Sequence, residues 1–404
     1  EHGALHRADD GLFRGRMVSP VPLPLPPSAR ELGVRRLRAE ELHRVALAVA
    51  DHVDGGAALP ADHPDNAVAR RATSAAFVAD SLTYPASGGF DTGTLSIHDV
   101  ATHVLPPGDG YDLAARQPIV AGTPLIRPDI ALRAFPSLAT PVGSGPLLLS
   151  GGSPSAVVLD RLVAASGGSG SQVVVLAAGY AKAEIATKDA KAYAASLATR
   201  GVSATWFLVN AQTKATEVTA ALASADGVLL TAPDPARILA GLSAAPAVTA
   251  AIEGAWLGGA AVLADDAAAS ALSSAFTADP RPGATTGQIE AAAIREFRPD
   301  SVTPVAGLGW VDIAVEPGIV SNRPWGRLYN LIAAQPAAER LAFGIDAGTA
   351  VEFRSDLAAP VVLGESAVVA LDGRFASFGA GSNGALAARW AILDTFVGGE
   401  EVAP

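Results

Sequence analysis

One stretch of the chain, Gly258 to Leu272, constrains the fold more than any other. It reads Gly-Gly-Ala-Ala-Val-Leu-Ala-Asp-Asp-Ala-Ala-Ala-Ser-Ala-Leu. A short apolar run ends on two adjacent acids, Asp265 and Asp266, and small residues suited to a helix follow at once. This order is typical of a strand that turns sharply into a helix and lifts one side chain to the carboxyl edge of a sheet. Hydrolases place a nucleophilic serine or cysteine at such a corner, whereas this chain places a carboxylate there.

The sequence around this corner alternates short apolar runs with Ala-rich helical segments from Pro146 onward. The expected strands are Leu147–Leu149, Val173–Ala178, Ala204–Val209, Gly227–Leu230 and Ala260–Ala264, and the expected helices are Pro154–Ala165, Asp189–Thr199, Ala215–Ala223 and Pro235–Leu242. A later block should add antiparallel strands at Val311–Val315, Ala342–Ile345, Ala350–Phe353, Val361–Val362 and Ala367–Leu371. This alternation predicts an α/β fold with a mainly parallel sheet flanked by helices.

Two flanking regions lack this alternation. Residues 1–140 are expected to form an extension in which the proline-rich run Val21–Pro27 is extended and Arg38–Val53 and Asn66–Leu82 are helices. The α/β domain should span residues 145–375, and the tail, residues 376–404, should contain an amphipathic helix that needs an apolar partner. We therefore expect a homo-oligomer, or assembly with another protein.

Composition excludes several classes of function. The chain has 404 residues and a net charge of −11, so it offers no basic field to recruit a nucleic acid or phosphate groups. No apolar run is long enough to span a membrane. No cysteine is present, which excludes a disulfide and a thiolate nucleophile. The sequence begins at Glu1, which we interpret as a processed or trimmed chain, and we expect an extracellular or cell-surface location, with the cytoplasm as the alternative.

Several short motifs resemble, in order and spacing, those of one enzyme family. They are Leu148-Leu149-Ser150-Gly151-Gly152, Gln172–Ala178, Leu229–Leu239, Gly307–Trp310, Gly326-Arg327-Leu328 and Gly344–Ala350. Together they resemble the cyanophycinase-like serine peptidases, peptidase family S51, which include peptidase E. The resemblance covers roughly Pro146 to Leu371 and implies an α/β fold related to class I glutamine amidotransferases.

The same comparison shows where this chain departs from the family. Asp266 stands at the position of the family's nucleophilic serine, and Gly318 stands at the position of its histidine, two residues after Glu316. Where the family has Gly-Gly-Asp-Gln before a helix, only the acid, Asp234, remains. The Gly151-Gly152 turn belongs to the family's active-site rim and could present backbone N–H groups to an anion. The possible pocket or carboxylate site therefore comprises Gly151, Gly152, Asp234, Asp265, Asp266 and Glu316.

The distribution of histidines supports the loss of serine chemistry independently of the resemblance. A nucleophilic serine needs a base that accepts its proton. All seven histidines precede the α/β region: His2, His6, His43, His52, His63, His98 and His103. Ser270, one helical turn after the corner, is interpreted as filler. His52, His63, His98 and His103 with Asp51, Asp54, Asp62 and Asp65 match no familiar metal site, so we expect neither a metal nor a cofactor.

Two interpretations of the corner acids stay open. In the first, Asp265 or Asp266 caps the following helix, and Asp234 caps its own, so that the protein is a pseudoenzyme with a binding or structural role. In the second, Asp266, Asp265 and Asp234 form a carboxylate site of a hydrolase that acts on a peptide, an ester or a glycoside. The preferred prediction is the pseudoenzyme.

Overall fold

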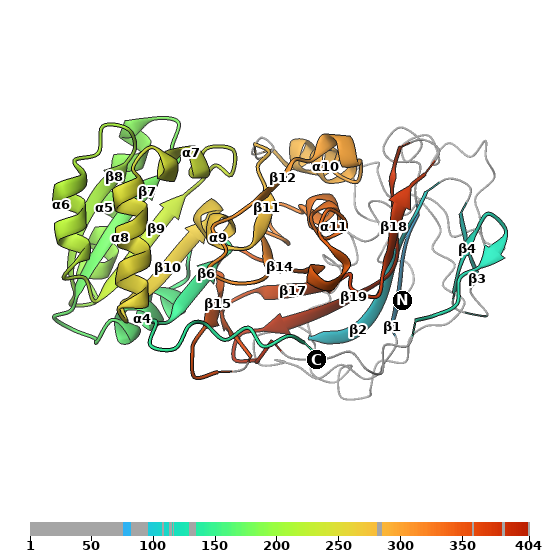
Figure 1. Cartoon of the computed structure of the whole chain (residues 1–404), viewed down its shortest axis with the longest axis horizontal. Coiled ribbons are helices and arrows are strands. Elements are labelled where there is room, and N and C mark those ends of the chain that lie inside the picture. The colour runs from blue at the N-terminus through green and yellow to red at the C-terminus, as the bar shows by residue number, and fades with distance from the viewer. Residues whose placement is uncertain are drawn as a thin grey trace, which may run out of the picture.

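The computed structural model of the chain contains two large β-sheets that lie next to one another (Figure 1). It describes residues 76–81, 96–106, 109–112, 115, 117–128, 135–280, 285–357, 359–381 and 384–402. The expected helix Arg38–Val53 and the proline-rich run lie outside these residues. None of the helices in the described part of the chain has the length and apolarity that crossing a membrane requires.

The first sheet has seven strands and contains the α/β alternation. Its order is β16, β15, β6, β10, β9, β7, β8. Strands β6, β10, β9, β7 and β8 are parallel, β15 is antiparallel to β6, and β16 is antiparallel to β15. The strands are β6 Leu147–Ser150, β7 Gln172–Ala178, β8 Ser203–Val209, β9 Gly227–Ala232, β10 Ala261–Asp266, β15 Thr349–Phe353 and β16 Val361–Gly364. The predicted mainly parallel sheet is therefore confirmed.

Helices cover both faces of this sheet. They are α4 Ala156–Ala165, α5 Ala183–Ala198, α6 Ala215–Leu222, α7 Ile238–Ser243, α8 Pro246–Leu257 and α9 Ala267–Leu272. Because successive strand residues point to opposite faces, Leu148 of β6 packs with α4 and α5, whereas Leu147 and Leu149 pack with α6, α7, α8 and α9. Strands buried on both faces explain the nearly continuous apolar runs of the sequence.

The second sheet has nine strands and mixes distant parts of the chain. Its order is β1, β2, β19, β17, β14, β13, β11, β12, and β18 pairs with β19. The strands are β1 Ala76–Ser81, β2 Ile97–Leu105, β11 Ala275–Thr277, β12 Pro304–Ala306, β13 Ala314–Pro317, β14 Leu341–Ile345, β17 Ala367–Asp372, β18 Ser377–Ala380 and β19 Leu386–Val397. Helices α10 Thr286–Arg295 and α11 Trp325–Ala333 accompany it, and Leu328, Leu331 and Ile332 of α11 pack in its core. Strands β3 Gly110–Asp112, β4 Gln117–Val120 and β5 Thr123–Pro124 form a separate small sheet.

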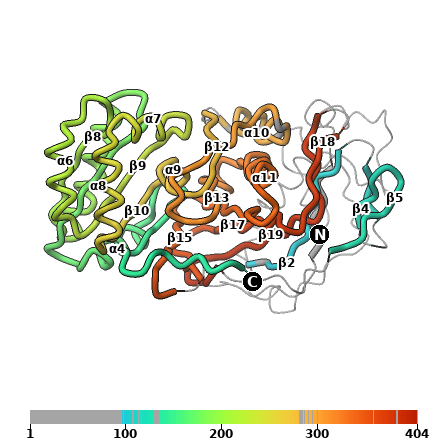
Figure 2. Tube along the Cα trace, in the orientation of Figure 1, coloured from blue at the N-terminus to red at the C-terminus, as the bar shows by residue number. Residues whose placement is uncertain are grey.

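Two expected helices are strands in this second sheet. The helix expected over Asn66–Leu82 is wrong where the structure describes it, because Ala76–Ser81 is strand β1. The helix expected in the tail is also wrong, because Leu386–Val397 is the long strand β19, which pairs with β2 on one side and β17 on the other. Figure 2 shows these early and late segments side by side. Strands β1 and β2, from residues 1–140, and strands β18 and β19, from the tail, therefore belong to the same sheet as β13, β14 and β17.

Candidate functional site

The strand-to-helix corner lies where the sequence places it, between β10 and α9. Asp266 has φ 61° and ψ −125°, a backbone conformation that side chains other than glycine rarely adopt. Such a residue costs on the order of 1–3 kcal/mol and persists only where the surrounding structure enforces it. All six residues of α9, which follows Asp266 directly, are buried. The corner has thus kept the sharp turn that lifts one side chain to the sheet edge.

Capping does not account for the acid at this corner. Asp266 occupies the N-cap position of α9, yet its side chain makes no capping hydrogen bond. Asp265 points elsewhere: it is buried and accepts hydrogen bonds from Ser150 Oγ at 3.1 Å and from Tyr193 OH at 2.7 Å. Asp265 therefore ties β10 to β6 and to α5. The interpretation of these two acids as helix caps is wrong.

Tyr193 is a site residue that sequence reasoning missed. Burial, followed by the charge of Asp265, raises the pKa of Tyr193 well above the usual tyrosine value, so its hydroxyl keeps its proton. It is the only tyrosine in the Ala-rich helix α5, where nothing in the local pattern marks it. Its partner lies 72 positions away, so only the fold reveals the contact.

The Gly151-Gly152 turn lies next to the corner. A side-chain carbon at position 152 would lie 3.7 Å from Cγ of Asp266, and one at position 151 would lie 2.1 Å from the carbonyl oxygen of Ile345. Both backbone N–H groups are used inside the protein, because Gly151 donates to Thr349 O at 3.0 Å and Gly152 donates to Ser150 Oγ at 3.3 Å. The turn passes close to the carboxylate without offering these two donors to a ligand.

Gly318 lies close to the Gly151-Gly152 turn, because both contact the carbonyl oxygen of Ile345. Its N–H donates to Ile345 O at 2.6 Å, the same carbonyl that excludes a side chain at position 151. Gly318 has φ +72°, and a side-chain carbon there would lie 2.3 Å from Nδ2 of Asn322. The structure therefore brings the Gly151-Gly152 turn close to both Asp266 and Gly318.

Asp346 holds the loop that contains Gly318 and was not among the predicted site residues. Its Oδ1 accepts hydrogen bonds from the backbone N–H groups of Val320 at 3.2 Å and Ser321 at 2.9 Å, and from the Ser321 hydroxyl. Its Oδ2 accepts from Ser366 Oγ at 2.6 Å. Asp346 lies within the motif Gly344–Ala350, and this motif was the feature of the sequence that could have identified it.

The other two candidate acids serve local structure. Asp234 follows β9, where its carboxylate accepts the N–H of Ala236 at 2.9 Å and Nε of Arg237 at 2.9 Å. Asp234 was expected to cap the following helix, but α7 begins at Ile238 with Arg237 at its N-cap and no side-chain capping hydrogen bond, so that interpretation is wrong. No group of three or more His, Cys, Asp or Glu side chains in the described ranges is arranged to hold a metal ion.

Glu316 lies in the other sheet, in a buried ion cluster. It accepts a hydrogen bond from Thr277 Oγ1 at 2.7 Å and lies 4.0 Å from Nη1 of Arg327. Arg327 also binds Glu296, with Nε at 2.7 Å from Oε1. Burial raises the pKa of Glu296. Burial lowers the pKa of Arg327, but the charges of Glu316 and Glu296 outweigh this effect and raise it. Glu316 therefore neutralises a buried arginine.

The two described histidines lie on β2. His103 is buried, accepts the N–H of Trp390 at 3.1 Å and contacts the rings of Tyr111 and Trp390. The His98 ring lies 4.8 Å from that of Phe396. Neither of these contacts involves the corner, and His2, His6, His43, His52 and His63 lie outside the described residues, as do Asp51, Asp54, Asp62 and Asp65. Ser270 is buried in α9, as its interpretation as filler requires.

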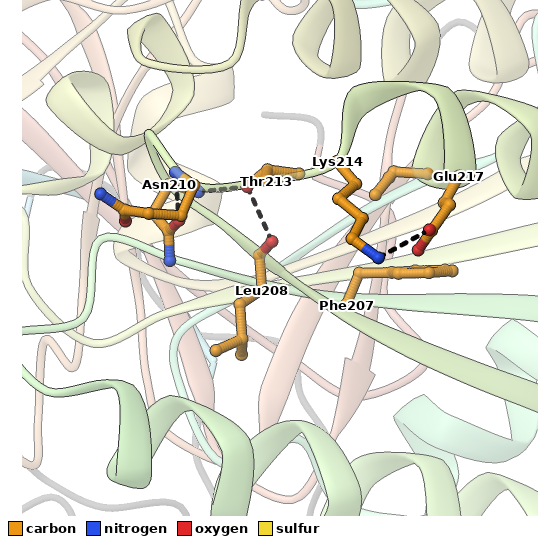
Figure 3. A pocket seen from close by; sticks show the side chains of 8 residues that line it. Phe207, Leu208, Asn210, Thr213, Lys214 and Glu217 are labelled. Carbon is orange, nitrogen blue, oxygen red and sulfur yellow. Dashed lines mark hydrogen bonds and ion pairs between the residues drawn. The ribbon is translucent and has the colours of Figure 1, made fainter.

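Two cavities open near the carboxyl ends of the parallel strands. One, of about 240 Å³, lies beside β8 and α6, where Lys214 binds Glu217 and Thr213 bonds with Asn210 and Leu208 (Figure 3). The other, of about 250 Å³, lies between the segments that follow β7 and β9. Neither cavity is lined by Asp265 or Asp266.

Comparison with known proteins gives structural neighbours only. No family profile matches the sequence, and no curated protein does. A crystal structure of a peptidase from an acI-B1 Actinobacterium aligns with a TM-score of 0.47 at 17% identity, covering 65% of this chain and 97% of that one. A putative peptidase E protein from Listeria monocytogenes EGD-e aligns with a TM-score of 0.36 at 14% identity, covering 55% of this chain and 98% of that one. These solved structures are peptidases, and at TM-scores below 0.5 the likeness carries no argument about what this chain does.

Proposed function

We propose that this chain is a non-catalytic protein on a hydrolase-type α/β scaffold, with a binding or assembly role. The observation that carries the proposal is the corner itself. Asp266 holds the backbone conformation of a nucleophile turn but presents a carboxylate in place of a hydroxyl. The scaffold has kept its shape at the point where its resemblance to cyanophycinase-like serine peptidases would require a serine.

The surroundings of Asp266 support the same conclusion. Acyl transfer needs a base near the nucleophile and donors aimed at the developing oxyanion. Gly318 stands where the resemblance would require the base and has no side chain to act as one. The N–H groups of Gly151 and Gly152 are engaged by Thr349 and Ser150. Among the described residues, therefore, Gly318 offers no base and the Gly151-Gly152 turn offers no free donors.

The direct test is turnover of a panel of peptide, ester and glycoside substrates by the purified chain. We expect no turnover above a buffer control, and no change in Asp266→Asn. Asp312→Asn serves as a matched control, because Asp312 is an exposed acid outside the corner. Turnover that is lost in Asp266→Asn and kept in Asp312→Asn would overturn the proposal.

The open edge of the seven-stranded sheet supports an assembly role. β8 pairs only with β7 among the described strands, and its sequence Ser-Ala-Thr-Trp-Phe-Leu-Val carries no charge and no proline. Natural edge strands are normally short, charged or covered, because an unpaired edge invites another strand. The opposite edge strand, β16, has four residues and is bridged at Val361 to Glu401. We assign the assembly role to the β8 edge, with a second copy as the partner.

This assignment is tested by molar mass in solution. Thr205 is exposed in the middle of β8, and Thr205→Lys places a charge on the edge. Light scattering after size exclusion should give a dimer for the natural chain and a monomer for Thr205→Lys. Thr216→Lys, at an exposed position of α6, should remain dimeric. A monomeric natural chain, or a dimer that Thr205→Lys leaves intact, contradicts the assignment.

One observation favours a second candidate, a hydrolase with Asp266 as nucleophile. The strained backbone at Asp266 is retained without a capping hydrogen bond, and strain of this kind clusters at active sites. In such an enzyme an Asp266 oxygen would attack a substrate carbon and expel the leaving group. With a peptide or ester substrate the intermediate would be a mixed anhydride, formed as the amine or alcohol leaves, and with a glycoside it would be a glycosyl ester. Water would then cleave the intermediate and regenerate the Asp266 carboxyl group. After many turnovers in ¹⁸O water, a gain of mass in the Asp266 peptide would support the covalent route, and turnover that survives Asp266→Asn would exclude it.

A further inference from the structure

The cavity between β7, β8 and α7 lies where open α/β sheets bind ligands. After β7 the chain passes into α5, which packs on one face of the sheet, whereas after β8 and β9 it passes into α6 and α7 on the other face. A crevice at the carboxyl ends of strands whose connections diverge in this way is the usual ligand site of such sheets. The cavity of about 250 Å³ occupies this crevice.

Two glycines shape the cavity. A side-chain carbon on Gly179, which has φ +70°, would lie 2.9 Å from Cα of Ile238. One on Gly241 would lie 2.9 Å from the backbone nitrogen of Gly179. Real carbon atoms do not approach so closely, so α7 reaches the end of β7 only because both positions lack side chains. The cavity is therefore fixed by backbone packing.

Its polar lining consists of hydrogen-bond donors. Nε of Arg237 donates to Asp234 at 2.9 Å, which orients the guanidinium, and its terminal amino groups form no hydrogen bond within the described ranges. Oδ1 of Asn210 accepts the N–H of Gln212 at 2.8 Å, and its amide nitrogen has no partner in the same part of the chain. Tyr180 lies 3.4 Å from Thr231 Oγ1, and burial raises its pKa so that the hydroxyl stays protonated.

The remaining lining is apolar, and no carboxylate belongs to it. The wall contains Ala177, Ala183, Ala186, Ala240, Leu208 and Val209. Donors on one side and methyl groups on the other match an anion with an apolar body. The volume equals that of roughly eight liquid waters at about 30 Å³ each, which limits the ligand to a small molecule.

The charges around the cavity favour a carboxylate over a phosphate. Arg237 is the single cation of the lining, and Asp234 already balances part of its charge. A phosphate dianion would be left without a counter-charge in a chain of net charge −11. A carboxylate carries one charge and two oxygens that fit the paired terminal nitrogens of an arginine.

We propose that this cavity binds a small organic monocarboxylate, with its oxygens on Arg237 and Asn210 and its apolar body against the alanine wall. Neither Asp265 nor Asp266 lines this cavity, so the assignment holds whether or not Asp266 is catalytic. A binding measurement therefore tests it without reference to turnover.

The experiment is calorimetric titration of the full chain with butyrate. Butanol, which lacks the charge, and inorganic phosphate serve as comparison ligands. We expect saturable binding of butyrate and at least tenfold weaker binding of both others. Equal binding of butyrate and butanol, or tighter binding of phosphate, would overturn the assignment, as would the absence of butyrate binding.

Two variants in the cavity and one control variant test whether butyrate binds at this site. Arg237→Gln should weaken butyrate at least tenfold, and Ala240→Leu, at an exposed lining position, should do so by filling the cavity. Arg354→Gln is the matched control, because Arg354 is also partly exposed and its Nε binds a nearby acid, Asp356, at 2.8 Å. Unchanged thermal melting establishes that each variant is folded. Butyrate affinity that survives both cavity variants refutes the site.

Discussion

The two sheets of this molecule are built from the chain in opposite ways. In the seven-stranded sheet, each parallel strand is joined to the next along the chain by helical segments, and the interior is mostly Leu, Val and Ala, with two buried acids, Asp265 and Glu352. In the nine-stranded sheet, β2 pairs with β19 across about 290 residues, and the interior holds charged groups such as Arg327, Glu296 and Asp394. Local strand and helix units make most of the first sheet, whereas the second depends on long-range pairing and holds a larger set of buried charges.

The largest expected effect tests whether those buried charges hold the second sheet. Arg327→Leu leaves Glu296 and Glu316 without their cation, and breaking a buried ion pair costs about 3–5 kcal/mol. Arg354→Leu, which breaks an exposed pair, should cost no more than about 1 kcal/mol. Urea unfolding followed by circular dichroism measures both. Equal losses would show that burial of the charges does not distinguish the two regions.

A smaller loss of stability is expected when Asp265, the buried acid of the corner, loses its hydrogen bond from Tyr193. Tyr193→Phe removes the 2.7 Å hydrogen bond to Asp265, and a bond to a charged group contributes about 1.5–3 kcal/mol. Tyr180→Phe removes a 3.4 Å contact with the Thr231 hydroxyl and a weaker interaction with Asp189, and should cost less, about 0.5–1.5 kcal/mol. The same unfolding experiment compares the two. A greater loss in Tyr180→Phe would be inconsistent with Asp265 as the anchor of β10.

Replacing the strained residue itself should stabilise the protein. Asp266→Gly relieves strain on the order of 1–3 kcal/mol and loses about 0.5–1 kcal/mol to the greater freedom of glycine when unfolded. The net gain should be about 1 kcal/mol. Ala220→Gly, at an exposed position in α6, carries the entropic loss alone and should destabilise. Destabilisation by both changes to the same degree would mean that Asp266 is unstrained.

The smallest effect is a dependence on pH. Because burial raises the pKa of Glu296, its protonated form favours the folded state. That contribution is complete below the pKa of an unfolded glutamate, about 4.3, and is lost as pH rises through the folded value. Thermal melts between pH 4 and pH 7 should therefore show Glu296→Gln gaining on the natural chain as pH rises. A difference that moves the other way would assign the dominant influence to Arg327.

The comparison also explains which parts of the fold the sequence predicts. From Leu147 to Leu272 the expected strands are all present, and the expected helices occur with shifted ends, because each unit is formed by local apolar spacing and closed by a short turn. The α8 helix, Pro246–Leu257, went unpredicted although Val248, Ile252 and Trp256 recur at helical spacing and its first residue is a proline. In this half the corner at Asp266 was predictable from sequence.

In the second sheet the same reasoning predicts strands that overlap β13, β14 and β17, but it fails at β1 and β19 for a physical reason. β19 is buried on both faces along most of its length, so its residues do not alternate between apolar and polar. Leu386, Trp390, Leu393 and Phe396 then resemble one face of a helix, and alanines strengthen that pattern. Pairing with β2 and β17 overrides the local preference. The roles of Tyr193, Glu316 and Asp346 depend on such distant partners and were likewise hidden.

The pairing of β2 with β19 has a consequence for synthesis in the cell. Strand β2 leaves the ribosome when its partner, Leu386–Val397, has not yet been translated, about 290 residues later. At about 5–20 residues per second, β2 waits on the order of 15–60 seconds with one side unpaired. The α/β half has time to fold during this interval. A nascent chain arrested before residue 386 should therefore present a protease-resistant core with β1 and β2 still open to cleavage or to a chaperone.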